Sequence, residues 1–241
     1  MGDMLPTTDK LHPETRRRRI VCLGGAAIDH VFTVDAIPPR PTKVQATSHC
    51  ERQGGDAATA ALAIAAMGHA AAYWGRVGDD ANGTRIRTRL TDAGVDCAAL
   101  RRVAGARTAT AAAIRDAGGR QLVASFAGAG LGDDPGWLPL DALAGMDAVL
   151  ADTSWPAGAR SLLRAARASG VPSVVIARAD MDDPTCVAEL AALADHVPVA
   201  ATGCGEGFHG AYALAVARGL GAVEAMRFAV GVATVPARGT R

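Results

Sequence analysis

Short apolar runs alternate with alanine-rich segments along most of the 241 residues, and this alternation constrains the fold more than any other feature. The apolar runs predict strands at residues 20–27, 73–77, 148–151, 171–177 and 197–201. The alanine-rich segments predict helices at residues 56–67, 83–93, 158–168, 187–194, 208–218 and 223–232. Strands and helices at this spacing form parallel β-α-β units with helices on both faces of the sheet. The sequence therefore predicts a layered α/β/α domain over residues 20–241, preceded by a disordered basic tail over residues 1–19.

Two more polar segments interrupt this pattern, at residues 31–51 and 107–127. Both contain residues that alternate in polarity, as strands with one wet face do. Prolines divide the first segment, and Gly118-Gly119 divides the second at a point that favours a hairpin. The two segments predict a small β appendage to the main domain.

The charge balance excludes several classes of function. Lys and Arg number 25 against 24 Asp and Glu, so the net charge of +1 gives no general attraction to nucleic acid or to an anionic membrane. No apolar run approaches the roughly 18 residues that span a bilayer. The five cysteines are odd in number and form no C-x-x-C pair, which disfavours disulfides and structural zinc. We expect a cytoplasmic protein without a nucleic-acid or membrane partner.

A glycine-rich turn at residues 201–210 lies between a predicted strand and a predicted helix. Glycines allow successive backbone N–H groups to converge at the positive end of the helix, which suits a phosphate group. Glu206 is the only carboxylate in this turn. It either acts on chemistry beside the anion or only interacts favourably with the helix dipole.

The same turn contains a G-x-G-x-x-G pattern, formed by Gly205, Gly207 and Gly210. A dinucleotide site of this type also needs a second strand that ends in an acidic residue about 20 positions later. Glu224 is near that position but lies in a predicted helix. Dinucleotide binding is therefore the weaker alternative for this turn.

Three further segments occur in a fixed order before the turn, GGAAID at 24–29, GGDAATA at 54–60 and GRVGDDANG at 75–83. Together with the turn, these segments resemble the ribokinase-like, or PfkB-type, carbohydrate kinases along most of the chain. The resemblance implies an α/β domain with a β-sheet lid that transfers the γ-phosphate of ATP, with Mg²⁺, to a hydroxyl of a sugar or nucleoside.

The resemblance also implies an acceptor site. Asp29 would accept hydrogen bonds from sugar hydroxyls, because a carboxylate can accept two of them in a fixed geometry. Gly54 and Gly55 would let the substrate approach the backbone. Asp56 would touch the substrate or cap the following helix. Thr59 stands where the family usually has an asparagine that contacts the sugar.

In the same comparison, Gly203, Cys204 and Gly205 would form an anion hole, and Glu206 would occupy the position of the catalytic aspartate. A base there takes the proton from the acceptor hydroxyl. No side chain is predicted as a metal ligand. Residues 31–51 and 107–127 would form the lid, which excludes water and offers a surface for a homodimer.

The chain differs from the family in four respects. Glutamate replaces the catalytic aspartate, and Thr59 replaces the asparagine. The family's N-x-x-E motif is absent, because the only asparagine is Asn82. Residues 199–200 lead almost directly into the turn, where the family has several strands and a helix, so we expect that an internal segment is missing. A catalytically impaired sugar-binding protein on the same scaffold is the alternative function.

Overall fold

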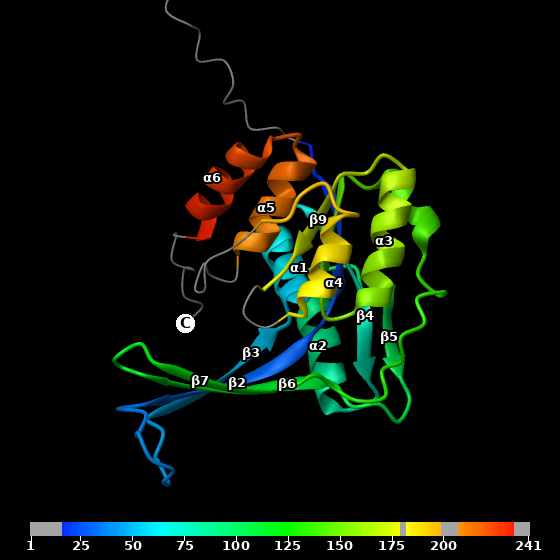
Figure 1. Ribbon diagram of the computed structural model, residues 1–241. Helices are drawn as coiled ribbons and strands as arrows, with labels where there is room; N and C mark the ends of the chain where they lie inside the picture. Colours follow the sequence, from blue (N-terminus) through cyan, green and yellow to red (C-terminus); the bar gives the residue numbers. More distant parts are fainter. Residues whose placement is uncertain (1–15, 179–181, 199–206, 234–241) are drawn as a thin grey trace, which may run out of the picture.

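The computed structural model describes residues 16–178, 182–198 and 207–233, and a five-stranded parallel sheet forms its centre (Figure 1). The strand order is β5-β4-β1-β8-β9. The strands are β1 (Arg19–Gly24), β4 (Ala70–Gly78), β5 (Leu100–Val103), β8 (Ala148–Asp152) and β9 (Ser173–Ile176). The central strands consist of continuous apolar runs because helices cover both faces of a parallel sheet. Five residues in β1 and all five in β8 are buried.

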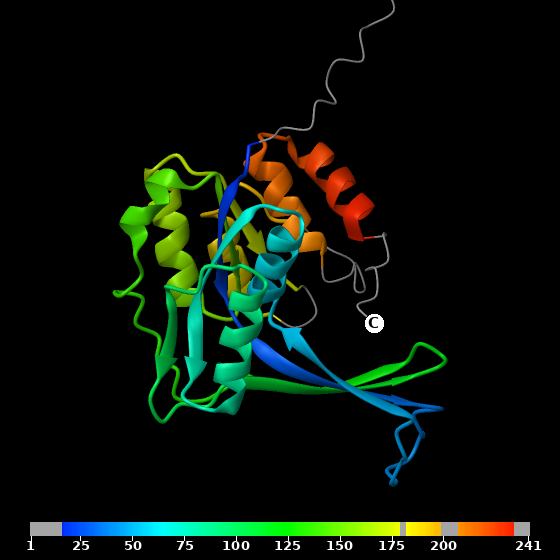
Figure 2. The ribbon, with the colours of Figure 1, turned by 180° about the vertical axis from the view of Figure 1, so that it is seen from behind.

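The helices divide into two groups, one on each face of the sheet (Figures 1 and 2). One face carries α1 (Asp56–Ala66), α2 (Ala81–Asp92) and α5 (Phe208–Ala217), with α6 (Ala222–Ala233) packed on α5. The other face carries α3 (Pro156–Ala168), α4 (Pro184–Ala191) and the 3-10 helix η1 (Leu140–Gly145). This arrangement confirms the predicted layered α/β/α fold.

A second sheet extends away from the layered domain (Figure 2). Its strand order is β3-β2-β6-β7, with β2 parallel to β6 and the other two pairs antiparallel. The strands are β2 (Ala27–Val34), β3 (Ser48–Gly54), β6 (Ala109–Asp116) and β7 (Gln121–Phe126). Every residue of β7 is exposed. The β appendage expected from the two polar segments is thus present, and its action as a lid stays a prediction.

Two short glycine-containing links join the second sheet to the layered domain. Gly25 and Ala26 connect β1 directly to β2, and Gly55 connects β3 to α1. Both links lie at the carboxyl end of the parallel sheet, where α/β proteins usually bind their ligands.

At the start of the described chain, the folded domain begins earlier than the sequence predicted. Arg19 is the first residue of β1, and Arg18 is held by contacts at both its backbone and its side chain. Its N–H donates to Nδ1 of His69 over 3.1 Å, and its guanidinium lies 3.5 Å from the carboxylate of Asp147. Arg18 and Arg19 therefore belong to the folded domain, whereas the disordered basic tail was expected to extend to residue 19. Residues 1–15 lie outside the described residues.

Two elements were not predicted from the sequence, and one prediction is only partly covered. The pattern gave no indication of β5 or η1. Of the strand predicted at 197–201, only residues 197 and 198 are described. The residue before them, His196, forms a parallel bridge with Val174 of β9.

Candidate active site

The two glycine links touch each other at the carboxyl end of β1. Gly55 has a φ of +89°, which disfavours residues with a side chain. A Cβ at Gly55 would overlap the carbonyl oxygen of Gly25 and would lie 2.7 Å from Cα of Ala26. The residue therefore has to be glycine for both conformational and steric reasons.

Asp29 lies beside these links. It is a partly exposed residue of β2, opposite Arg52 of β3 and Ala111 of β6. A Cβ at Gly54 would overlap the Asp29 carboxylate, so this carboxylate lies directly against the glycine backbone. The structure thus brings Asp29, Gly54 and Gly55 together, and their contact with a substrate stays a prediction.

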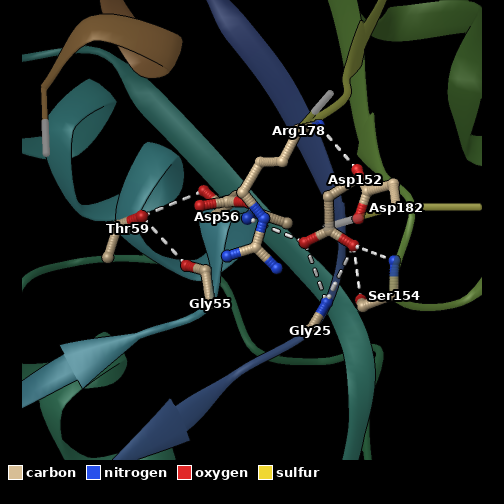
Figure 3. A network of polar contacts seen from close by, with 9 residues as sticks. Gly25, Gly55, Asp56, Thr59, Asp152, Ser154, Arg178 and Asp182 are labelled. Carbon is tan, nitrogen blue, oxygen red and sulfur yellow. Dashed lines mark hydrogen bonds and ion pairs between the residues drawn. The ribbon is translucent and has the colours of Figure 1, made fainter. Parts of the chain in front are cut away.

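Asp56 and Thr59 occupy the first turn of α1 (Figure 3). Gly55 is the N-cap residue and has no side chain that could cap the helix, so the suggested capping role of Asp56 is wrong. Asp56 instead pairs with Arg178, with 3.6 Å between Oδ2 and Nε. The Thr59 hydroxyl bonds to the carbonyl oxygens of Gly55 and Asp56, at 2.9 and 3.0 Å. Its only hydrogen is therefore used inside the helix, and its oxygen can only accept from a ligand.

Asp152, the last residue of β8, is a site residue that the sequence analysis missed. It is only 3% exposed. Its carboxylate accepts hydrogen bonds from the backbone N–H groups of Gly25, Ala57 and Ser154 and from the Ser154 hydroxyl (Figure 3). Burial raises the pKa of Asp152, the Ser154 hydrogen bond acts to lower it, and the nearby Asp56 carboxylate raises it further.

One sequence signal could have found Asp152. It is the first polar residue after an apolar run that was already predicted as a core strand. Side chains at the carboxyl ends of central parallel strands commonly line the ligand site.

The first turn of α5 packs against α1. Burial lowers the pKa of His209, while the charges of Asp56 and Arg178 act on it in opposite directions. A Cβ at Gly210 would lie 2.6 Å from the carbonyl oxygen of Ala60, so the two helices pack very closely there. The helix that follows the glycine-rich turn therefore begins near Asp56.

The proposed anion hole and base, Gly203, Cys204, Gly205 and Glu206, lie outside the described residues. Gly207 is the N-cap residue of α5. In the described part of the chain α5 leads into α6, which contains Glu224. Within residues 207–233 no strand follows α5, whereas a dinucleotide site requires one.

The described residues contain no group of three or more His, Cys, Asp or Glu side chains that could hold a metal ion. None of the described helices is long and apolar enough to cross a membrane. The site consists of carboxylates, one guanidinium, one imidazole and the backbone of glycines. Such groups can bind and orient a molecule with many hydroxyls through directional hydrogen bonds.

Comparison with known proteins agrees with this arrangement. The profile of the pfkB family carbohydrate kinases matches residues 17–200. The chain is 29% identical over 153 residues to an ATP-dependent ribose-1-phosphate kinase of Halopiger xanaduensis, covering 64% of this chain and 52% of the relative. It is 36% identical over 96 residues to fructokinase-1 of Oryza sativa, covering 40% of this chain and 28% of the relative. The chain thus spans about half, or less, of the length of these relatives.

Solved structures match over more of the chain. A protein from Agrobacterium tumefaciens, provisionally assigned as a ribokinase, has a TM-score of 0.80 at 25% identity and covers 90% of both chains. Arabidopsis thaliana ribokinase in complex with ribose and ATP has a TM-score of 0.68 at 20% identity, covering 92% of this chain and 94% of the other. At that identity the likeness shows the fold alone. Because the family profile matches most of the chain, the protein belongs to the pfkB family of carbohydrate kinases.

Proposed function

We propose that this chain transfers the γ-phosphoryl group of ATP to a hydroxyl of a sugar or nucleoside. The observation that carries the proposal is the proximity of α5 to α1. The helix that follows the glycine-rich turn begins near Asp56, and Asp56 follows the glycine pair against which Asp29 lies. A phosphate group at the start of α5 would therefore be close to an acceptor bound at Asp29.

The proposed reaction divides the work between two groups of residues. Asp29 accepts hydrogen bonds from acceptor hydroxyls, and the substrate approaches the backbone at Gly54 and Gly55. The Glu206 carboxylate takes the proton from the attacking hydroxyl, a contribution of about 10²–10⁴-fold in rate. Most of the remaining acceleration comes from positioning and from stabilisation of charge on the transferred group.

The anion-binding part consists of the backbone N–H groups of Gly203, Cys204 and Gly205. ATP supplies the phosphoryl group as a substrate, together with Mg²⁺. Mg²⁺ usually keeps several waters and binds nucleotide phosphates rather than a cage of protein ligands. That preference is compatible with the lack of a metal-binding cluster among the described residues.

The test is the formation of ADP with a panel of pentoses, hexoses, sugar acids and nucleosides in the presence of Mg²⁺. We expect ADP to form with at least one acceptor. Glu206→Gln should abolish turnover and leave the affinity for that acceptor nearly unchanged, because the effect is confined to the transition state. No turnover with any acceptor at high protein concentration would contradict the proposal.

A second candidate function is sugar binding without catalysis. Two observations favour it, namely Glu206 in place of the family's aspartate and the short connection at residues 199–200, where we infer that a segment is missing. Calorimetry that detects sugar binding but no ATP binding would support it. Measurable phosphoryl transfer would exclude it.

We also propose that the second sheet acts as a lid over the acceptor and as a homodimer surface. The exposed apolar side chains Leu122, Val123 and Phe126 on β7 support this role. Sedimentation equilibrium should detect a dimer, and substitution of Leu122 and Phe126 by serine should shift it to a monomer. A monomer at all concentrations would contradict the dimer.

A further inference from the structure

The carboxylate of Asp152 joins three segments that are far apart in the sequence (Figure 3). The N–H of Gly25, in the link from β1 to β2, donates to its two oxygens over 3.0 and 3.2 Å. The N–H of Ala57, in the first turn of α1, donates to Oδ2 over 3.0 Å. The N–H of Ser154, after β8, donates to Oδ1 over 2.9 Å, and the Ser154 hydroxyl donates to the same oxygen.

These bonds leave Asp152 no free capacity for a ligand. A carboxylate offers about four lone-pair directions, and the backbone and hydroxyl donors already use them. The residue is also 3% exposed. Asp152 therefore has neither the access nor the open acceptor positions that a catalytic base or a sugar ligand needs.

Asp152 also supplies what α1 lacks. The N-cap of α1 is Gly55, which has no side chain to accept from the N–H groups of the first turn. Asp152 accepts from one of them, that of Ala57, and places a carboxylate at the positive end of the helix. The start of α1 is thus held from β8.

The segments that Asp152 holds carry the acceptor-binding groups. Gly25 lies four residues before Asp29 on the chain that enters β2, and Ala57 follows Asp56. The neighbouring glycines pack tightly against Asp152 and Ser154. A Cβ at Gly24 would overlap the Asp152 carboxyl group, and one at Gly25 would lie 2.7 Å from the Ser154 hydroxyl oxygen. A displacement of Asp152 would therefore move the β1–β2 link and the start of α1 relative to each other.

We propose that Asp152 is a positioning residue for the acceptor site, which fixes Asp29 and the Gly54–Gly55 backbone in the geometry that binds the sugar. This inference rests on the proposed function, since it takes that acceptor to be a sugar or nucleoside. It assigns no contact between Asp152 and the substrate.

The test compares Asp152→Asn with Asp147→Asn. The amide of Asp152→Asn loses one acceptor oxygen and directs N–H groups toward N–H donors. Asp147 is a matched control, because it also accepts a backbone N–H, that of Arg19 in β1, over 2.8 Å. It lies just before the start of β8, at the opposite end of the strand from Asp152. The measurements are KM for the acceptor that the unmodified protein phosphorylates best, KM for ATP, and the dissociation constant of that acceptor by calorimetry.

For Asp152→Asn we expect KM and the dissociation constant of the acceptor to rise about tenfold or more, with KM for ATP changed less than about twofold, as expected for loss of a hydrogen bond to a charged group. Asp147→Asn should leave both KM values within about twofold. Equal acceptor affinity in Asp152→Asn and the unmodified protein would overturn the inference, as would an equal loss of acceptor and ATP affinity.

Ser154→Ala keeps the test open if Asp152→Asn does not fold. It removes one donor and leaves the backbone bonds of Asp152, so acceptor KM should rise about two- to threefold without a change in KM for ATP. No change in acceptor KM for a folded Ser154→Ala would then overturn the inference. If the unmodified protein neither binds nor phosphorylates any acceptor, the proposed function itself fails, whereas a change confined to the variants bears on Asp152 alone.

Discussion

One aspartate lies just before β8 and another is its last residue, and both accept backbone N–H groups at the ends of β1, yet the two aspartates have different surroundings. At the amino end, Asp147 accepts from the Arg19 N–H and pairs with the side chains of Arg16 and Arg18, over 3.0 and 3.5 Å. At the carboxyl end, Asp152 accepts from backbone N–H groups of the glycine link and of α1.

The difference indicates that contacts at the amino end of the sheet contribute to stability alone, whereas contacts at the carboxyl end also shape the binding site. At the amino end the Asp147 carboxylate pairs with the largely buried Arg18 and the exposed Arg16. An exposed pair such as that with Arg16 usually contributes about 1 kcal/mol or less. At the carboxyl end the partners are backbone groups next to the acceptor residues, so any movement there changes the shape of the site. We expect substitutions at the amino end to alter stability and substitutions at the carboxyl end to alter binding as well.

The largest difference in stability is expected between alanine substitutions of two glycines at opposite ends of α1. Gly55→Ala introduces both a disfavoured positive φ and a steric overlap with the Gly25 carbonyl, which should reduce the free energy of unfolding by about 3 kcal/mol or more. Gly68 has a φ of +83° but no neighbouring atom within 4 Å of a new Cβ, so Gly68→Ala should cost only about 1 kcal/mol. Urea denaturation measures both values. Equal losses would show that the contact between the glycine links is not as close as described.

The next prediction concerns the acceptor carboxylate. Asp29→Asn should raise KM for the acceptor about 10- to 100-fold, because a hydrogen bond to a charged group contributes about 1.5–3 kcal/mol. The control is Asp195→Asn, whose carboxylate accepts from Ser173 at the amino end of β9. Steady-state kinetics should show no change in acceptor KM for the control. A similar rise in both variants would contradict the separation of the two ends.

Asp80 follows the carboxyl end of β4, and its contribution to stability should depend on pH. It accepts from the N–H of Thr108 over 2.7 Å and from that of Gly83 over 2.8 Å. Burial acts to raise the pKa of Asp80, but the hydrogen bonds of Thr108 and Gly83 outweigh it and hold that pKa below its ordinary value. Asp80 therefore stabilises the fold above the unfolded-state pKa of about 3.9, and this contribution disappears as the pH falls through the folded-state pKa.

Asp80→Asn should thus lower the free energy of unfolding by about 1–2 kcal/mol at pH 7, with a smaller difference below about pH 4. Urea denaturation at several pH values measures this difference. A difference that stays constant down to pH 3 would mean that the ionised carboxylate contributes nothing.

The smallest effect is expected at the amino end, for His69. Burial lowers the pKa of His69, and the charges of Arg218, Arg18 and Arg17 lower it further. The unfolded chain then binds a proton at His69 more readily than the folded protein, so stability falls as the pH drops below about 6.5. His69→Gln should flatten the dependence of stability on pH between about 7 and 5, without a change in acceptor KM. An unchanged slope would contradict the lowered pKa.

The sequence was sufficient to predict the layers of the fold because the core elements have uniform patterns. The continuous apolar runs of β1 and β8 are typical of buried strands, and the glycine after α1 is typical of a helix end. The strand β5 was missed because its sequence, LRRV, contains two exposed arginines at the edge of the sheet. Asp152 was missed because its role depends on contacts with Gly25 and Ala57, which the linear order of the sequence does not show.

The candidate site was predictable where glycine pairs and a carboxylate occur in the family's order, as at Asp29 and Gly54–Gly55. The partner of Asp56 was not predictable, because Arg178 follows the carboxyl end of β9 and is far from Asp56 in the sequence. The roles of Gly203, Cys204, Gly205 and Glu206 stay predictions.

The most direct measurement is a crystal structure of the protein with the acceptor that gives the most ADP. We expect the sugar at the carboxyl end of β1, with a hydroxyl oxygen within about 3.2 Å of the Asp29 carboxylate. A sugar bound elsewhere, or at this end without any contact to Asp29, would contradict it.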